Sequence, residues 1–214
     1  NMACTAKHFP GDGVEELDQH LALGVNNLPV EEWEASYGKI YSTLIDEGLE
    51  AVMVGHIALP EMSRKLRPGI KDSEIMPATL APELLTGLLR ESMGFNGVII
   101  TDASHMVGIS AMSKRCDAVP GAIIAGCDMF LFANDIEEDI GFMKAAYDKG
   151  LLTEERLSDA LHRVLGLKAH LKLYDEAIRC PEEENLKVIG CEEHQDFTVQ
   201  AADSCITLVK DTRK

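Results

Sequence analysis

The chain has 214 residues, of which 46% are hydrophobic and 26% charged, so it is long enough for one large domain with a substantial core. It carries 36 acidic against 20 basic residues and a formal net charge of -16, which disfavours binding to nucleic acid or to an anionic membrane surface. No apolar run reaches the roughly 18 residues needed to cross a bilayer, so no membrane association is expected.

Four short apolar runs, residues 2–9, 49–57, 97–101 and 128–133, predict strands that are buried on both faces. Amphipathic helical patterns cover residues 30–47, 82–93, 118–125, 136–149 and 154–172. Strand alternating with helix indicates an α/β protein with a parallel sheet and right-handed crossovers. Two architectures fit this pattern: an open doubly wound sheet, or part of a (β/α)8 barrel.

The pattern changes after Tyr174. Residues 175–191 contain Pro181 and an acidic run, and we interpret them as a linker. A helix is predicted over 192–204 and a strand over 205–210. We therefore expect a first domain over residues 1–174 and the truncated beginning of a second α/β domain over 192–214.

The six cysteines stand at positions 4, 116, 127, 180, 191 and 205, and none forms a C-x-x-C pair. Cys4, Cys127 and Cys205 lie in apolar runs, so we expect buried free thiols and not zinc ligands or disulfides. Free thiols favour a reducing compartment, and a cytoplasmic location is therefore expected.

Asp102 closes the apolar run 98–100, at the carboxyl end of a predicted strand, where both candidate folds place their sites. Such a carboxylate can attack an anomeric carbon, bind a metal or accept a phosphoryl group, or it can simply cap the next turn. Lys7 with His8, and His56, end two other predicted strands, so we expect these side chains at the same edge of the sheet.

Asp18 and His20 lie two residues apart in a loop that follows the first predicted strand. A carboxylate at this spacing can hydrogen-bond the imidazole and fix its tautomer, which prepares the histidine for general acid and base catalysis near neutral pH. The alternative is a solvated acidic loop that contains an incidental histidine.

A metal site is a further alternative, because His8, Asp12, Asp18 and His20 are ligand types that zinc or manganese accepts. Lys7 would place a positive charge beside the ion, and the spacing matches no common metal motif. We therefore expect neither a metal nor another cofactor.

Several segments resemble glycoside hydrolase family 3. Residues 6–13 (AKHFPGDG) resemble its A-K-H-F-P-G-H-G loop, and Asp18-Gln19-His20 resembles the D-S-H dyad of its β-N-acetylglucosaminidase branch. Residues 77–86 and 94–106 resemble the segment that leads into the nucleophile. Residues 150–173 resemble its last barrel helix, and residues 194–210 resemble the start of its second, α/β-sandwich domain.

The resemblance implies the C-terminal half of a (β/α)8 barrel followed by the start of that second domain. It implies that Asp102 attacks the anomeric carbon to form a glycosyl-enzyme, while His20, oriented by Asp18, protonates the leaving oxygen and later activates water. Lys7 and His8 would bind sugar hydroxyls, and we expect His56 to bind the substrate as well.

Two loop positions depart from the family pattern: Asp12 replaces the commoner His, and Gln19 replaces Ser. The dyad favours removal of terminal β-linked N-acetylglucosamine. A β-glucosidase or β-xylosidase, and a half-barrel sugar-binding module without catalysis, remain alternatives. The expected partners are a carbohydrate and either the missing N-terminal half of the barrel or a second copy of the chain.

Overall fold

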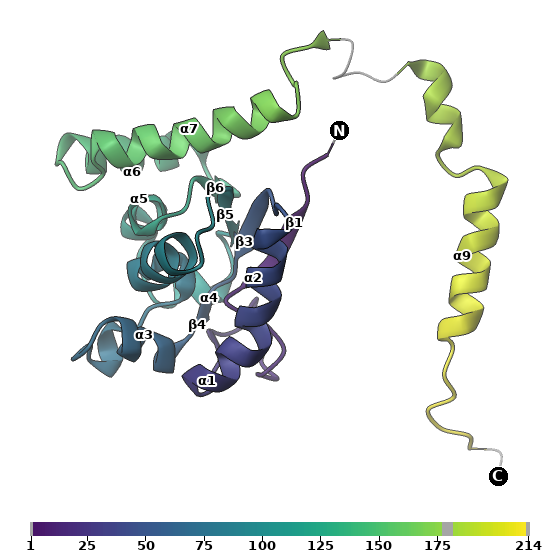
Figure 1. Ribbon diagram of the computed structural model, residues 1–214, viewed down its shortest axis with the longest axis horizontal. Helices are drawn as coiled ribbons and strands as arrows, with labels where there is room; N and C mark the ends of the chain where they lie inside the picture. The colour runs from purple at the N-terminus through teal and green to yellow at the C-terminus, as the bar shows by residue number, and fades with distance from the viewer. Residues whose placement is uncertain (1, 177–181, 213–214) are drawn as a thin grey trace. The chain divides into compact units, whose positions relative to one another are not determined.

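The computed structural model describes residues 2–176 and 182–212, and the chain separates into two compact units, Asn1–Leu171 and Lys172–Lys214. The first unit contains a four-stranded sheet with helices packed against it (Figure 1). Its strands are β1 (Thr5–Phe9), β3 (Ala51–Val54), β5 (Val98–Ala103) and β6 (Met129–Leu131). A small separate sheet pairs β2 (Gly24–Val25) with β4 (Ile57–Ala58).

The four strands of the main sheet are all parallel and lie in chain order, β1-β3-β5-β6. A doubly wound sheet reverses its strand order at a switch point, and the described strands show no such reversal. The predicted α/β class is confirmed, and the observed order is that of consecutive strands in a (β/α)8 barrel.

Helices connect the strands. The connection from β1 to β3 carries α1 (Val30–Trp33), a π-helical segment (Glu34–Gly38) and α2 (Lys39–Asp46). The remaining helical segments of the first unit are α3 (Pro60–Leu66), 3-10 turns at Asp72–Glu74 and Ala78–Leu80, a π-helical segment (Glu83–Ser92), α4 (Val107–Ser110), α5 (Arg115–Ala125), α6 (Ile136–Asp148) and α7 (Glu154–His170). All five predicted helices of this unit are therefore confirmed, with shifts of a few residues at their ends.

The core lies between the sheet and these helices. The ring of Phe9, the last residue of β1, packs edge-on against Trp33 and Tyr41, with ring centroids 6.3 and 5.2 Å away. Leu84 and Leu85 on the π-helical segment are fully buried as well. Removing these large apolar side chains from water is what holds the helices on the sheet.

The start of β6 carries a buried ion-pair network. The side chain of Asp128 is fully buried, and its carboxylate lies 2.5 Å from Arg90 and 2.6 Å from Arg156. Its Oδ2 also accepts a hydrogen bond from the backbone N–H of Ile99 at 2.9 Å, which joins the beginnings of β5 and β6. Burial lowers the pKa of Arg90, and the charge of Asp128 opposes that shift.

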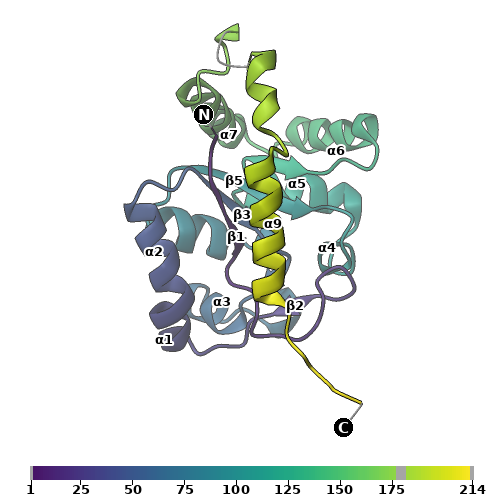
Figure 2. The same cartoon turned by 90° about the vertical axis from the view of Figure 1, so that its right-hand side faces the viewer.

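The described part of the second unit contains a 3-10 helix (Glu183–Val188) and α9 (Glu192–Cys205), and Figure 2 shows α9 in side view. The helix predicted over 192–204 is confirmed, but the strand predicted over 205–210 is wrong, because Cys205 ends α9 and residues 206–210 have no regular structure. A strand must pair its backbone N–H and C=O groups with a neighbour, and the described part of this unit offers none. Of the predicted linker, residues 177–181 lie outside the described part of the chain.

The prediction of buried thiols is confirmed for Cys127 and wrong for Cys4 and Cys205, which are exposed. Cys4 precedes the edge strand β1, and Cys205 ends an exposed helix, so the apolar runs around them do not become core. Cys180 lies outside the described residues. Among the described helices, none has both the length and the hydrophobicity that a membrane span requires.

Candidate active site

Asp102 lies near the carboxyl end of β5, and its side chain retains 16% of its solvent exposure. One carboxylate oxygen, Oδ1, accepts the backbone N–H of Ala103 at 2.7 Å. The other, Oδ2, faces the imidazole of His8, whose Nε2 lies 3.4 Å away. The structure therefore brings His8 and Asp102 together from two different strands, as the sequence predicts.

His8 lies between two carboxylates. Its Nδ1 is 3.5 Å from Asp12 Oδ2, on the side opposite to Asp102. The turn that carries Asp12 depends on Gly11, which has a φ of 134°, because a Cβ there would lie 2.3 Å from the ring of Tyr37. The hydroxyl of Tyr37 in turn donates to the backbone oxygen of Asp12 at 2.6 Å.

Asp18 and His20 form the predicted dyad, with His20 Nδ1 2.7 Å from Asp18 Oδ1. The same carboxylate oxygen accepts the backbone N–H of His20 at 2.9 Å. These two hydrogen bonds, the backbone one first, lower the pKa of Asp18. Since Nδ1 is held by the carboxylate, Nε2 is the nitrogen of His20 through which a proton can be exchanged with a substrate.

The loop that carries this dyad is attached to the turn after Asp102. The backbone oxygens of Gln19 and His20 accept the N–H groups of Gly108 and Val107 at 3.2 and 3.4 Å. Beyond the dyad, the loop ends in β2, which pairs with β4. The dyad and Asp102 therefore lie on the same side of the sheet, at the carboxyl ends of its strands.

His56 is the site prediction that the geometry does not support. Its side chain is fully buried, Nε2 donates to the backbone oxygen of Ala103 at 3.0 Å, and Nδ1 lies 2.8 Å from Thr79 Oγ1. Burial lowers the pKa of His56, and the hydrogen bond to Ala103 opposes that shift. Because both ring nitrogens are occupied inside the protein, His56 supports the residue after Asp102 and does not present a surface to a sugar.

Lys7 is exposed on β1 and lines a cavity of about 220 Å³ together with His8 and Asp12. Within the described part of the chain, no hydrogen bond or ion pair joins Lys7 to Asp102 or to the dyad. Nor do the described residues contain a group of three or more His, Cys, Asp or Glu side chains placed to hold a metal ion.

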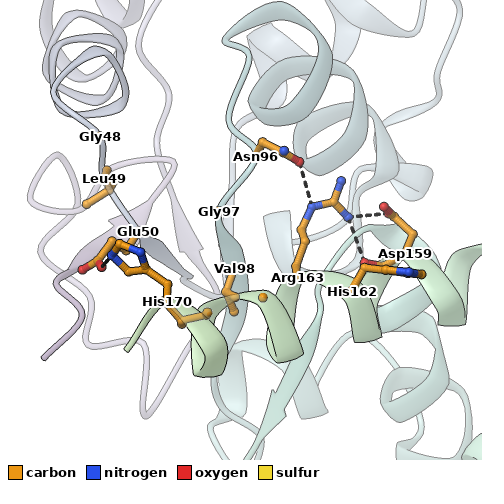
Figure 3. A pocket seen from close by; sticks show the side chains of 12 residues that line it. Gly48, Leu49, Glu50, Asn96, Gly97, Val98, Asp159, His162, Arg163 and His170 are labelled. Atoms are coloured by element: carbon orange, nitrogen blue, oxygen red, sulfur yellow. Dashed lines mark hydrogen bonds and ion pairs between the residues drawn. The ribbon is translucent and has the colours of Figure 1, made fainter. Parts of the chain in front are cut away.

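Another cavity, of about 610 Å³, lies at the opposite edge of the sheet (Figure 3). Its lining includes Glu50 and Val98, at the amino ends of β3 and β5, and two residues of α7, Arg163 and His170. Arg163 Nε donates to Asn96 Oδ1 at 3.2 Å across this cavity. In barrels of this type the amino face contributes stability and the carboxyl face carries the site, so this cavity is separate from the candidate active site.

The sequence pattern could not reveal the contacts of Asp12 and Gln19. Both residues stand out in the sequence only as departures from a family pattern, whereas their contact with each other and that of Asp12 with His8 appear only in the folded loop.

Comparison with known proteins places this geometry in a family. Residues 1–167 match the model of the glycosyl hydrolase family 3 N terminal domain. A curated relative from Cellulomonas fimi, named beta-N-acetylglucosaminidase/beta-glucosidase, is 47% identical over 210 residues, which are 98% of this chain and 37% of the relative.

Solved structures agree with this match. The beta-glucoside phosphorylase BglX bound to 2FGlc is 44% identical with a TM-score of 0.91, over 99% of this chain and 38% of that one. A family 3 beta-N-acetylglucosaminidase from Paenibacillus sp. is 29% identical with a TM-score of 0.74, over 85% of this chain and 33% of that one. The chain thus spans less than two fifths of the length of these relatives, and over that length it belongs to glycoside hydrolase family 3.

Proposed function

We propose that the full-length protein is a retaining glycosidase that removes terminal β-linked N-acetylglucosamine through a covalent glycosyl-enzyme. The observation that carries this proposal is the 2.7 Å contact between His20 and Asp18, in a loop attached to the turn that follows Asp102. An oriented imidazole and a carboxylate on a rigid strand are the acid/base and the nucleophile that a double displacement requires.

In the first step the Asp102 carboxylate attacks the anomeric carbon, and the bond from this carbon to the leaving oxygen breaks. His20 gives its Nε2 proton to that oxygen, and Asp18 stabilises the orientation of the imidazole. In the second step Nε2 takes a proton from the incoming acceptor, and the acceptor oxygen bonds to the anomeric carbon as the bond from this carbon to Asp102 breaks. His8 is proposed to hold a hydroxyl of the bound sugar, and its position 3.4 Å from Asp102 supports this role.

The preference for an N-acetylglucosaminide rests on the dyad and on the names of the relatives. A β-glucoside is the second candidate substrate, because the Cellulomonas fimi relative carries both activities in its name. The ratio of kcat/KM for chromogenic N-acetylglucosaminide and glucoside decides between the two.

Phosphate is a second candidate acceptor beside water, because the similar BglX structure is named a phosphorylase. After it has given up its proton, His20 is uncharged, so it repels an incoming anion less than a carboxylate base would. Assays with and without inorganic phosphate, with detection of a glycosyl phosphate, distinguish the two acceptors.

The test of the mechanism is a mechanism-based fluorosugar label on the full-length protein, mapped by mass spectrometry. We expect the label on Asp102 and no label on an Asp102→Asn variant. His20→Ala is expected to lower kcat/KM for substrates with poor leaving groups by about 10²- to 10⁴-fold. A label on another residue would overturn the assignment of the nucleophile.

A further inference from the structure

Asp12 and Gln19, the two loop positions at which this chain departs from the family pattern, contact each other. Gln19 Nε2 donates a hydrogen bond to Asp12 Oδ2 at 2.9 Å. Asp12 follows the strand that carries His8, whereas Gln19 stands between Asp18 and His20. The bond therefore joins the sugar-binding part of the loop to its acid/base part.

Asp12 is fixed from several directions. Its second carboxylate oxygen, Oδ1, accepts the backbone N–H of Gly13 at 3.0 Å. Its backbone oxygen accepts the hydroxyl of Tyr37 at 2.6 Å. These contacts hold the Asp12 carboxylate where Oδ2 can accept from Gln19 and also lie 3.5 Å from His8 Nδ1.

Gln19 is fixed as well, although its neighbours in the dyad are exposed. Only 8% of Gln19 is accessible to solvent. Its side chain lies against Gly24 and Gly55, where an added Cβ would be 3.1 and 3.2 Å from Gln19 atoms, so two glycines leave room for the amide. Its backbone oxygen accepts the N–H of Gly108, in the turn after Asp102, at 3.2 Å.

Together these contacts form one line of polar groups: Gln19 to Asp12 at 2.9 Å, Asp12 to His8 at 3.5 Å, and His8 to Asp102 at 3.4 Å. We propose that Asp12 and Gln19 are positioning residues that hold the dyad loop in register with His8 and the nucleophile. This inference rests on the proposed function. It assigns a joint role to two residues, each of which by itself looks like a neutral departure from the family pattern.

The first test measures kcat/KM of the full-length enzyme on two glycosides of the same sugar, one with a 2,4-dinitrophenyl and one with a poor, alkyl leaving group. A general acid matters only where the leaving oxygen needs a proton. Displacing the dyad should therefore affect the alkyl glycoside selectively. We expect Asp12→Ala and Gln19→Leu to lower kcat/KM about tenfold or more on the alkyl glycoside, and at most about threefold on the dinitrophenyl glycoside.

The matched control is Glu16→Ala, which removes an exposed carboxylate from the same loop and should change neither value. Equal losses on both substrates would indicate general damage to the site and overturn the proposal. No loss on either substrate would overturn it too.

A donor–acceptor exchange tests the bond itself. Gln19→Glu places two carboxylates where the 2.9 Å hydrogen bond now lies, and their repulsion should displace the loop. Adding Asp12→Asn restores one N–H···O bond with donor and acceptor exchanged. We expect the double variant to recover at least part of the alkyl-glycoside activity that Gln19→Glu loses, and a double variant no better than Gln19→Glu would contradict a direct bond.

Hydrogen exchange separates this inference from the proposed function. We expect Asp12→Ala and Gln19→Leu to exchange faster than wild type in residues 14–24 and at Gly108, with the melting temperature of the protein unchanged. If the wild type cleaved neither glycoside, the proposed function would fail, and exchange would still decide whether the contact holds the loop. Unchanged exchange in both variants would overturn the positioning role.

Discussion

Individual side chains at the carboxyl edge of the sheet divide into those that face the substrate and those that support them. Asp102 and His8 remain partly exposed, whereas His56 is fully buried behind Ala103. A side chain that acts on a substrate must be accessible to it. Buried neighbouring side chains can fix the orientation of such a group. Exposure therefore distinguishes Asp102 and His8, which are proposed to act on the sugar, from His56, which supports them from inside the protein.

Burial of His56 makes the stability of the protein depend on pH. Its pKa is lowered in the folded state, while in the unfolded chain it is about 6.5. As pH falls below about 6.5, the unfolded state takes up a proton that the folded state does not, so the free energy of unfolding decreases. The stabilisation is complete above this pH and is lost towards the folded pKa.

We expect this single group to remove up to about 1 kcal/mol between pH 6.5 and 5.5. The measurement is urea unfolding of wild type and His56→Gln at both pH values. The His56→Gln variant should be less stable than wild type at each pH, but its free energy of unfolding should change less between the two pH values. An equal pH dependence in the two proteins would show that folding does not lower the pKa of His56.

Gly108 is a second residue whose role follows from its surroundings. A Cβ at this position would lie 2.8 Å from His56 Cβ and 3.1 Å from its backbone oxygen. We expect Gly108→Ala to cost about 1–3 kcal/mol of unfolding free energy through overpacking, and to lower the activity of the full-length enzyme because the dyad loop is attached here. Gly141→Ala, in α6 with no atom within 4 Å of the added methyl, is the control and should stabilise by about 0.5–1 kcal/mol. A fully stable and active Gly108→Ala variant would contradict this view of the loop.

Among the secondary-structure elements, β6 is the shortest strand of the main sheet and depends most on side-chain bonds. It spans three residues, and the register between β5 and β6 shifts between Ile100 and Ala103. Asp128, just before the strand, bonds Ile99 N–H and two arginines and so replaces part of the missing strand pairing. Ion pairs and hydrogen bonds of Asp128 thereby stabilise the amino ends of β5 and β6, where β6 is too short to form many backbone hydrogen bonds.

Asp128→Asn should therefore be strongly destabilising, since it leaves arginines without their buried partner. We expect a loss of about 3 kcal/mol or more in unfolding free energy. Asp159→Asn is the matched control in the same network, because the Asp159 side chain is 46% exposed, and it should cost about 1 kcal/mol or less. Urea denaturation checks both values, and similar losses in the two variants would mean that burial of Asp128 does not govern the network.

For the whole molecule, the first unit presents surfaces that a compact domain normally covers. Strands β1 and β6 each have a neighbour on one side only among the described strands. On α7, Leu161 and Leu165 are 49% and 59% exposed and line a cavity of about 660 Å³. Open strand edges and contiguous apolar side chains favour association with further protein.

We expect the isolated 214-residue chain to be inactive on N-acetylglucosaminides and glucosides and to bind a hydrophobic dye strongly. Four strands of the sheet cannot enclose a sugar on all sides, so the isolated chain lacks part of any binding site. The same assays on the full-length protein provide the comparison. An isolated chain that is monomeric, stable and active would contradict the half-barrel interpretation.

The sequence by itself determined the α/β class and, through apolar periodicity, the four strands of the main sheet and five of the helices, but it did not predict β2, β4 or α3. A carboxylate at a strand end and two residues spaced for one hydrogen bond made Asp102, Asp18 and His20 candidates, and the resemblance to family 3 supplied their proposed roles. The sequence did not correctly predict the structure of residues 205–210, since an apolar run forms a strand only where a neighbouring strand pairs with it.

Only the tertiary structure decided between a doubly wound sheet and consecutive barrel strands, because strand order is a property of pairing. It also provides the contacts on which the proposed roles of His56, Asp12 and Gln19 rest. His56 bonds a residue 47 positions away, and Gln19 bonds Asp12, which is seven positions away. Contacts between groups separated along the chain depend on how the backbone folds back on itself, and no spacing along the sequence specifies them.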